Sequence, residues 1–291
     1  MRRLLEQGVA IFSWSGTLLL LTVLLVLLGY LGYRGAGAVD TGLIFGTIPP
    51  LDALLLRRQV FDGLFPAVAG TFALVLLAVG LAAPVGLAAG IYMAEYCRGR
   101  SRQVLGLFFD ILAGLPSIVV GLAGFSLTIA LHRLLPGSLG PCLLISALSL
   151  GFLILPYLIR STQLALESLP PALRLSAPAL GATKLQNIRY VLLPARLSAI
   201  LGGIILATGR AAEDTAVIML TGAVASVGLP RSLFEQFEAL PFFIYYISSQ
   251  YSDPDELQTG FGAAILLSAV CAVLLLGAFI IEQTLSRRLM R

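Results

Sequence analysis

The sequence predicts an all-α polytopic membrane protein of about six transmembrane helices, with a helical elbow on the cytoplasmic side between the fourth and fifth spans. Only 12% of the 291 residues are charged, about half the fraction that a soluble domain carries. The mean hydropathy is +0.96, and six long apolar runs each approach the roughly 20 residues that a helix needs to cross the hydrocarbon. No stretch between these runs is long enough to form a soluble domain.

The six predicted spans differ in how regular we expect them to be. The second and third are long enough to tilt or to break, at Pro84 and Pro116. The first has an alternative interpretation, because Arg2, Arg3 and the leucine-rich run after them are also typical of a cleavable signal peptide. That run is long for a signal core, so we expect a retained span. The spans cover residues 14–33, 65–93, 104–131, 142–159, 198–221 and 261–282.

Basic residues predict the orientation of the chain. Cytoplasmic loops carry an excess of Lys and Arg, and alternating the loops across the membrane gives one side most of these residues. This places both termini and the loops 94–103 and 160–196 in the cytoplasm. The richer side holds Arg2, Arg3, Arg98, Arg100, Arg102, Arg160, Arg174, Lys184, Arg189, Arg196, Arg287, Arg288 and Arg291, and the other side holds Arg34, Arg57, Arg58, Arg133 and Arg231.

The chain lacks the residue patterns of several enzyme and metal sites. A phosphate-binding loop needs GxxxxGK followed by Ser or Thr, and the single lysine, Lys184, cannot complete one. His132 is the only histidine, and the three cysteines form no CxxC pair, so neither feature indicates a metal or redox site. The net charge of +4 lies mostly on the cytoplasmic side and requires no nucleic-acid partner. We expect no cofactor on this chain and no enzymatic activity of its own, so that nucleotide energy would come from a partner.

The loop between the fourth and fifth spans predicts two short helices. Ser168 can cap the first helix, and Pro170 and Pro171 suit its first turn, where a missing N–H costs nothing. Gly181 suits the end of that helix, where a left-handed residue is preferred.

The second short helix begins after Thr183, which can act as its cap. Leu185, Ile188 and Leu192 then share one face, and Pro194 is expected to end the helix. The result is a helix–Gly–helix elbow with an apolar stripe. On its residues alone, the segment could equally be an amphipathic hairpin lying on the membrane surface.

The elbow resembles the cytoplasmic coupling loop of ABC importer permeases, whose pattern is EAA, three residues, Gly, nine residues and I-x-L-P. Two positions depart from it, because Leu175 holds the glutamate place and Pro178 stands where a helix former is usual. In such families the elbow fits a groove on the ATPase subunit and transmits its motion to the membrane helices. The resemblance therefore implies a coupling role for Ser176, Ala177, Gly181, Ala182, Thr183, Leu193 and Pro194.

Three further blocks narrow the resemblance to phosphate ABC importer permeases of the PstA type, across roughly residues 61–282. They are IYMAEY (residues 91–96), LAGLPSIVVGL (residues 112–122) and GRAAEDTAVIMLTGA (residues 209–223). The family usually has R-A-x-G-E-T-A in the last block. Here Arg210, Thr215 and Ala216 match, whereas Glu213 and Asp214 occupy the glycine and glutamate places.

This resemblance implies a bacterial inner-membrane permease that forms a path for inorganic phosphate with a homologous second permease. The implied partners are membrane lipid, two ATPase subunits that bind ATP and Mg, and a periplasmic phosphate-binding protein. Residues 1–60 would form an N-terminal transmembrane helix and a periplasmic linker, and residues 61–291 the permease domain, with the coupling loop at 160–196. Another oxyanion or a small solute is an alternative cargo. An ATP-independent secondary transporter is an alternative class, but it would lack the elbow and often shows inverted repeats, of which we find none.

Arg210, Glu213 and Asp214 lie within the fifth predicted span, where each charge should face a partner or a water-filled path. Arg210 neighbours Glu213 three residues on and Asp214 four residues on. One interpretation is an internal ion pair that makes the span insertable. Another is that Arg210 lines an anion path, since a guanidinium group matches phosphate oxygens in a bidentate fashion. A third is a gate that changes partners between states.

The third predicted span contains Asp110 and the block around Pro116 and Ser117. A helix that starts at a proline directs free N–H groups inward, which is how broken membrane helices contact anions. An ordinary proline kink is the alternative. We expect Asp110, near the cytoplasmic start of the span, to pair with an interfacial arginine such as Arg102.

Overall fold

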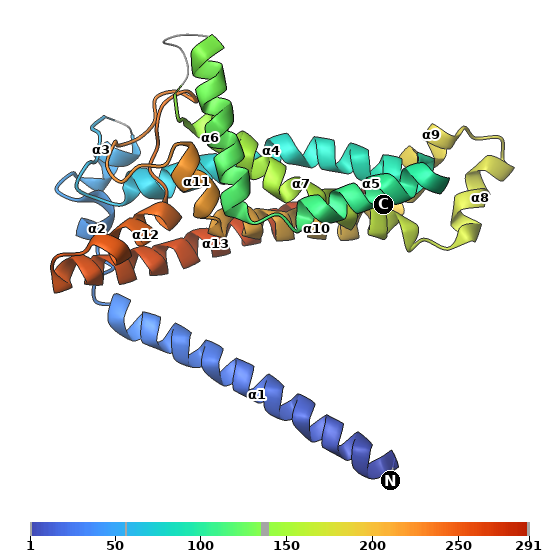
Figure 1. The fold of residues 1–291 in the computed structure, drawn as a ribbon, viewed down its shortest axis with the longest axis horizontal. Helices are drawn as coiled ribbons and strands as arrows, with labels where there is room; N and C mark the ends of the chain where they lie inside the picture. Colours follow the sequence, from blue (N-terminus) through green and yellow to red (C-terminus); the bar gives the residue numbers. More distant parts are fainter. Residues whose placement is uncertain (1, 56, 135–139, 290–291) are drawn as a thin grey trace.

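The computed structural model describes residues 2–55, 57–134 and 140–289. These residues are almost entirely helical, and the only strand-like pairing among them is an isolated bridge between Ala223 and Phe237. Most long helices run along the long axis of the molecule (Figure 1). In chain order the elements are α1 (Arg2–Gly35), α2 (Thr41–Phe45), α3 (Pro50–Leu54), α4 (Phe65–Ile91), the π-helical turn η1 (Tyr92–Tyr96), α5 (Gly99–Ala113), α6 (Ser117–Leu134), α7 (Leu143–Glu167), α8 (Pro171–Ala179), α9 (Lys184–Asn187), the π-helical turn η2 (Ile188–Leu192), α10 (Leu193–Glu213), α11 (Ala216–Thr221), α12 (Leu240–Gln250) and α13 (Pro254–Leu289).

Helix α7 is the centre of the core. It packs against α4, α5, α6, α10 and α11. Its closest neighbour is α4, which carries glycine where the two helices meet. A Cβ atom on Gly90 would lie 2.5 Å from the Cβ of Thr162, and one on Gly86 would lie 2.6 Å from the Cβ of Leu158. The small residues therefore let α4 lie directly on α7, so the two helices form one packed unit.

Among the residues that the structure describes, six helical stretches are long and apolar enough to cross a membrane, judged by length and composition. This confirms the predicted number of spans, and the third span breaks at Pro116, one of the two positions where a break was expected. The third predicted span, 104–131, is divided into α5 and α6 at residues 114–116, and α6 runs across the direction of α5 (Figure 1). The division has a local cause, because Pro116 lacks an N–H and disfavours helical backbone at Leu115. By contrast, α4 continues through Pro84 without a break.

The fifth predicted span, 198–221, is also interrupted. Helix α10 ends at Glu213, and Asp214 has an extended backbone with ψ of 118° before α11 begins. The fourth predicted span, 142–159, is longer than expected, since α7 continues to Glu167. Because α7 extends to Glu167, the elbow begins directly at its end.

The two ends of the molecule are built differently. One end carries α8 and α9, and the opposite end carries α2, α3, α12 and the loop of residues 222–239 (Figure 1). The start of α1 and the end of α13 both point toward the end with α8 and α9. Helix α4 runs from one end to the other (Figure 1). Near its start, the Thr71 hydroxyl accepts the N–H of Leu240, at the start of α12, at 2.9 Å.

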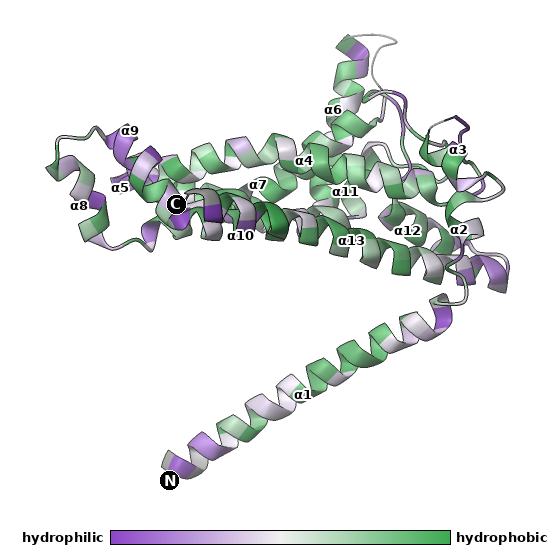
Figure 2. Cartoon of the chain, turned by 180° about the vertical axis from the view of Figure 1, so that it is seen from behind, coloured by the Kyte–Doolittle hydropathy of each residue, from purple (hydrophilic) through white to green (hydrophobic). Residues whose placement is uncertain are grey.

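Helix α1 stands apart from the rest of the chain (Figures 1 and 2). Its last turns pack on α13, where the rings of Tyr30 and Phe261 are 5.9 Å apart. The rest of its surface is apolar and exposed, including Trp14 at 76%. Apolar surface on this scale requires lipid or another subunit around it.

Candidate functional site

The first arm of the elbow is α8, which starts at its two prolines. Pro170 occupies the N-cap position and Pro171 the first helical turn, as their fixed φ favours. The prediction that Ser168 caps this helix is wrong. Its hydroxyl donates to the carbonyl of Ala165 at 2.7 Å, because Ser168 is still the end of α7 and the rigid Pro170 starts the next helix.

Gly181 ends this arm as predicted. Its φ is +83° and a Cβ there would meet no atom within 4 Å, so backbone conformation rather than space favours glycine. The amide of Ala182 donates to the carbonyl of Ala177 at 3.1 Å, which closes the end of α8. The hydroxyl of Ser176 bonds within the helix, to the carbonyl of Leu173 at 2.9 Å.

Pro178, the unexpected proline of α8, is compensated by the second arm. In a regular helix the N–H of residue 178 would donate to the carbonyl of Arg174. Proline has no N–H, and the side chain of Asn187 takes its place, donating to that carbonyl at 2.9 Å. The bond runs from one arm to the other, so it holds the two arms of the elbow together.

Thr183 caps the second arm as predicted. It forms a capping box with Gln186, in which the Thr183 N–H donates to the Gln186 side chain at 2.8 Å. The predicted stop at Pro194 is wrong, because the chain continues from α9 through η2 into α10, with Pro194 in the first turn of α10. The helix bends two residues later, at Arg196, where φ is −126°.

The predicted apolar stripe of the second arm is divided between two surroundings. Ile188 and Leu192 are buried at 3% and 0% exposure, where they pack with Leu166 at the end of α7. Leu185 faces away and is 67% exposed. At the end of the first arm, Leu180 is 90% exposed. The elbow therefore has an apolar outer surface that nothing in the described chain covers.

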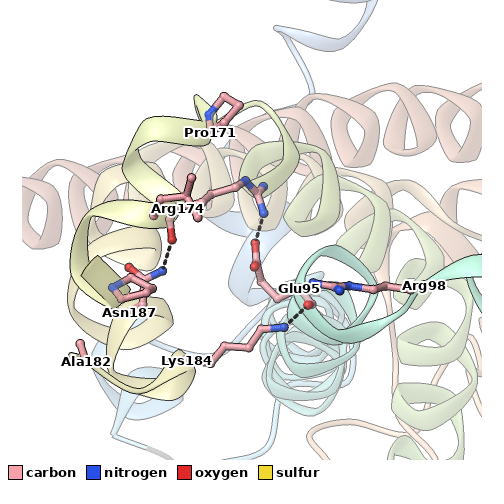
Figure 3. Close-up of a pocket in the computed structure, with 9 residues that line it drawn as sticks. Glu95, Arg98, Pro171, Arg174, Ala182, Lys184 and Asn187 are labelled. Carbon is pink, nitrogen blue, oxygen red and sulfur yellow. Dashed lines mark hydrogen bonds and ion pairs between the residues drawn. The ribbon is translucent and has the colours of Figure 1, made fainter. Parts of the chain in front are cut away.

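The inner side of the elbow faces η1, the turn that ends the second span (Figure 3). Here Arg174 forms an ion pair of 2.5 Å with Glu95. A cavity of about 470 Å³ opens beside this pair. Its lining residues are Glu95, Arg98, Pro171, Arg174, Leu175, Pro178, Ala182, Lys184 and Asn187.

At the far end of α10, Arg210 pairs with Glu213 at 3.0 Å and not with Asp214. The two side chains are 42% and 63% exposed. Asp214 is buried and its carboxylate accepts the N–H of Val217 at 2.9 Å, so it caps α11. Thr215 stands between the two helices at the interruption.

The break at Pro116 lies beside the interruption of the fifth span. Helix α6 begins at Ser117 and packs against α11. One turn into α6, a Cβ on Gly121 would lie 3.0 Å from the carbonyl oxygen of Ala216. The structure thus brings the first turns of the two helices together, and the charged end of α10 leads directly into one of them.

Asp110 pairs with a different arginine from the one expected. It accepts from Arg160 on α7 at 2.6 Å, whereas Arg102 pairs with Glu167 at 2.7 Å. Arg160 also donates to the carbonyl of Gly106 at 2.7 Å. Helix α5 lies along α7, so its acid reaches an arginine on the neighbouring helix more directly than one on its own helix.

Comparison with known proteins places this architecture in a family. The model of the family described as "Binding-protein-dependent transport system inner membrane component" matches residues 86–291. The chain belongs to this family. It is thus a multi-pass inner-membrane permease of the ABC importer type, and its curated relatives are permease subunits.

Several curated relatives of this permease are phosphate transport proteins. It is 33% identical to phosphate transport system permease protein PstA 1 of Mycobacterium tuberculosis over 240 residues, which cover 80% of this chain and 75% of the relative. It is 34% identical to PstA of Haemophilus influenzae, over 72% of each chain.

Solved structures share the fold of this permease at low identity. A bacterial alginate ABC transporter in complex with an alginate pentasaccharide-bound periplasmic protein aligns with a TM-score of 0.66 and 16% identity, over 94% of this chain and 95% of the other. The inward-facing MetNI methionine ABC transporter aligns with a TM-score of 0.58 and 18% identity, over 84% and 100%.

Sequence reasoning missed three residues that organise the elbow of this permease: Glu95, Arg174 and Asn187. Glu95 lay within the IYMAEY block, but nothing local connects it to a loop 79 residues later in the chain. Pro178 did carry a signal, because a proline inside a short helix leaves one carbonyl that another group must satisfy.

Proposed function

We propose that this permease moves inorganic phosphate inward, together with a homologous second permease, in an importer driven by ATP hydrolysis. Two ATPase subunits would bind ATP and Mg²⁺ and receive the elbow, and a periplasmic phosphate-binding protein would deliver the cargo at the opposite end. Both termini and the elbow are then cytoplasmic. The basic residues around the elbow support this orientation, and the names of the curated relatives support the cargo.

The observation that carries the proposal is the half-exposed Arg210–Glu213 pair on a membrane-spanning helix. The helical stretch Lys184–Glu213 is apolar enough to span, yet these two side chains are 42% and 63% exposed. A charge at the bilayer centre costs about 2.5–3.5 kcal/mol on insertion scales. This surface is therefore expected to face a second subunit and a water-filled path rather than lipid.

The chemistry of the pair suits a protonated tetrahedral anion. A guanidinium group can bind two phosphate oxygens at once, and the Glu213 carboxylate can accept a hydrogen bond from a phosphate hydroxyl. Sulfate carries no such hydrogen at neutral pH and would meet only repulsion at Glu213. The same pair would then favour phosphate over sulfate.

One observation favours a gating role as well. The Nε atom of Arg210 is buried and has no hydrogen-bond partner among the described residues. A donor left unsatisfied in one state can be satisfied in another. Arg210 would then exchange partners as the path opens, with Glu213 holding it in the state described here.

The test uses the complete transporter in proteoliposomes, with radiolabelled phosphate and the binding protein outside and ATP inside. Arg210→Gln should lose phosphate uptake while still assembling with its partners, and Arg3→Gln, at an exposed position near the start of α1, serves as the control. Sulfate should compete poorly. Unchanged uptake by Arg210→Gln would remove this residue from the path. Equal competition by sulfate would favour another oxyanion as cargo, and uptake without ATP would favour a secondary transporter.

A further inference from the structure

Both arms of the elbow hold the same residue, Glu95 (Figure 3). From the first arm, Arg174 forms a 2.5 Å ion pair with the Glu95 carboxylate. From the second arm, the Lys184 ammonium group donates to the Glu95 backbone carbonyl. Lys184 also lies over the ring of Tyr96, with its nitrogen 4.3 Å from the ring centre. The two arms thus converge on one turn at the end of the second span.

Arg174 links this turn to the rest of the elbow. Its second terminal nitrogen donates to the carbonyl of Leu166 near the end of α7, at 2.6 Å, and its own carbonyl accepts from Asn187 at 2.9 Å. One residue therefore contacts η1, α7 and α9. A displacement of α8 cannot occur without breaking these bonds or moving the groups that they hold.

The pair with Glu95 is more sheltered than the other ion pairs of the described chain. The side chains of Glu95 and Arg174 are 9% and 25% exposed, compared with 26% and 48% for Glu167 and Arg102. An exposed pair contributes little because water competes for both charges. Removal of one partner from a sheltered pair leaves a charge without compensation, so the cost is much larger.

Glu95 is connected through a long helix to the opposite end of the molecule. Turn η1 continues directly from α4, a helix of 27 residues and so about 40 Å long. Near the start of α4, the hydroxyl of Thr71 accepts the N–H of Leu240, and Gly70 lies so close to the Glu238 carbonyl that a Cβ would be 2.0 Å from it. Helix α4 therefore contacts the loop 222–239 at the other end of the molecule.

We propose that Glu95 is a positioning residue that transmits motion of the elbow to α4, with Arg174 and Lys184 as its two contacts. This inference rests on the proposed function, since the ATPase would supply the motion. When the ATPase displaces the elbow, the two arms pull the Glu95 turn with them, and α4 carries the displacement to the loop 222–239. The sheltered ion pair between Glu95 and Arg174 keeps the elbow and α4 together while the elbow moves.

The test measures coupling rather than uptake alone. In proteoliposomes with the complete transporter, phosphate uptake and ATP hydrolysis are recorded together for Glu95→Gln and Arg174→Gln. We expect the amount of phosphate moved per ATP to fall at least tenfold while hydrolysis and assembly persist. Arg102→Gln, which removes the more exposed pair with Glu167, is the matched control and should keep the wild-type ratio. The exchanged double variant, with Glu95→Arg and Arg174→Glu, should recover part of the ratio, and Glu95→Asp should be intermediate.

A second measurement separates this inference from the choice of cargo. Hydrogen exchange of residues 88–97 is compared with and without ATP and Mg²⁺ in transporter assembled with its ATPase subunits. ATP should change this exchange in the wild type and not in Glu95→Gln, whichever solute is carried. Wild-type transporter that shows the ATP effect but moves no phosphate would contradict the proposed cargo alone. A normal ratio in Glu95→Gln, or equal loss of hydrolysis and uptake in every variant, would overturn the role of Glu95.

Discussion

Asn187 should stabilise the elbow by satisfying a carbonyl that Pro178 leaves free. The carbonyl of Arg174 has no intrahelical donor, because residue 178 is proline. Asn187 supplies the donor at 2.9 Å, and this residue is buried, with only 5% of its surface exposed. We therefore expect Asn187→Ala to leave the carbonyl without a partner in a place that water does not readily reach.

The size of the effect can be worked out from the two ends of the Asn187 amide. A buried acceptor left unsatisfied costs about 1–3 kcal/mol. The other end of the amide offsets part of this cost, because the buried Oδ1 atom of Asn187 has no hydrogen-bond partner among the described residues and is removed in Asn187→Ala. The net loss should be near the lower limit, about 1 kcal/mol, which corresponds to about a fivefold increase in local opening.

Pro178→Ala provides a sharp control, because it restores the missing N–H of α8. In that background Asn187→Ala should cost less than about 0.5 kcal/mol, so the two substitutions should be clearly non-additive. Hydrogen exchange of the α8 and α9 amides in nanodiscs would measure local opening in the four proteins of the cycle. Ser176→Ala, which removes a hydroxyl bonded within α8, controls for a change of side chain alone. Equal effects of Asn187→Ala in both backgrounds would refute the compensation.

Three other substitutions test separate parts of the structure. Gly181→Asp should abolish uptake without preventing membrane insertion, since φ of +83° disfavours a side chain; normal uptake in this variant would contradict the coupling role. Leu180→Asp should reduce binding of the ATPase subunits in pull-down assays and change thermal stability by less than about 0.5 kcal/mol, because Leu180 is 90% exposed; undiminished binding would show that the outer surface does not dock. Burial raises the pKa of Glu238, although the N–H groups of Val227 and Gly228 partly oppose this. The stability that this carboxyl contributes is thus complete below about pH 4.3, its ordinary value, and falls as pH rises through the raised pKa. Glu238→Gln should weaken that decline in thermal unfolding curves, and an unchanged curve would contradict the argument.

Local chemistry was enough to predict the turns of the elbow. Gly181 needs a left-handed backbone and Thr183 needs only the next three residues to cap its helix, so both positions could be read from the sequence. Ser168 and Pro194 were misread because each fits two roles equally well. Ser168 suits a helix end as well as a start, and Pro194 suits the first turn of a new helix as well as the end of an old one.

The interruptions and ion pairs required knowledge of the packing. Hydropathy placed one span at 104–131 and another at 198–221, because it measures how apolar a segment is and not whether its backbone stays helical. Pro116 indicated one break, whereas the extended backbone at Asp214 had no comparable signal. Arg160 was not expected to pair with Asp110, since only the packing of α5 against α7 brings residues 50 positions apart together.

The two departures of the elbow from the coupling-loop pattern, Leu175 and Pro178, both line the cavity on its inner side. Leu175 stands at the glutamate place of the pattern and lines the cavity beside Glu95, where Arg174 forms its ion pair. Pro178 removes a helical hydrogen bond, and Asn187 replaces it from the other arm. The polar contacts of the first arm therefore lie on its inner side, with Glu95 and Asn187. If the elbow docks on an ATPase subunit as proposed, its exposed leucines, Leu180 and Leu185, would form the contact, so we expect docking to depend on the burial of apolar surface and only weakly on salt.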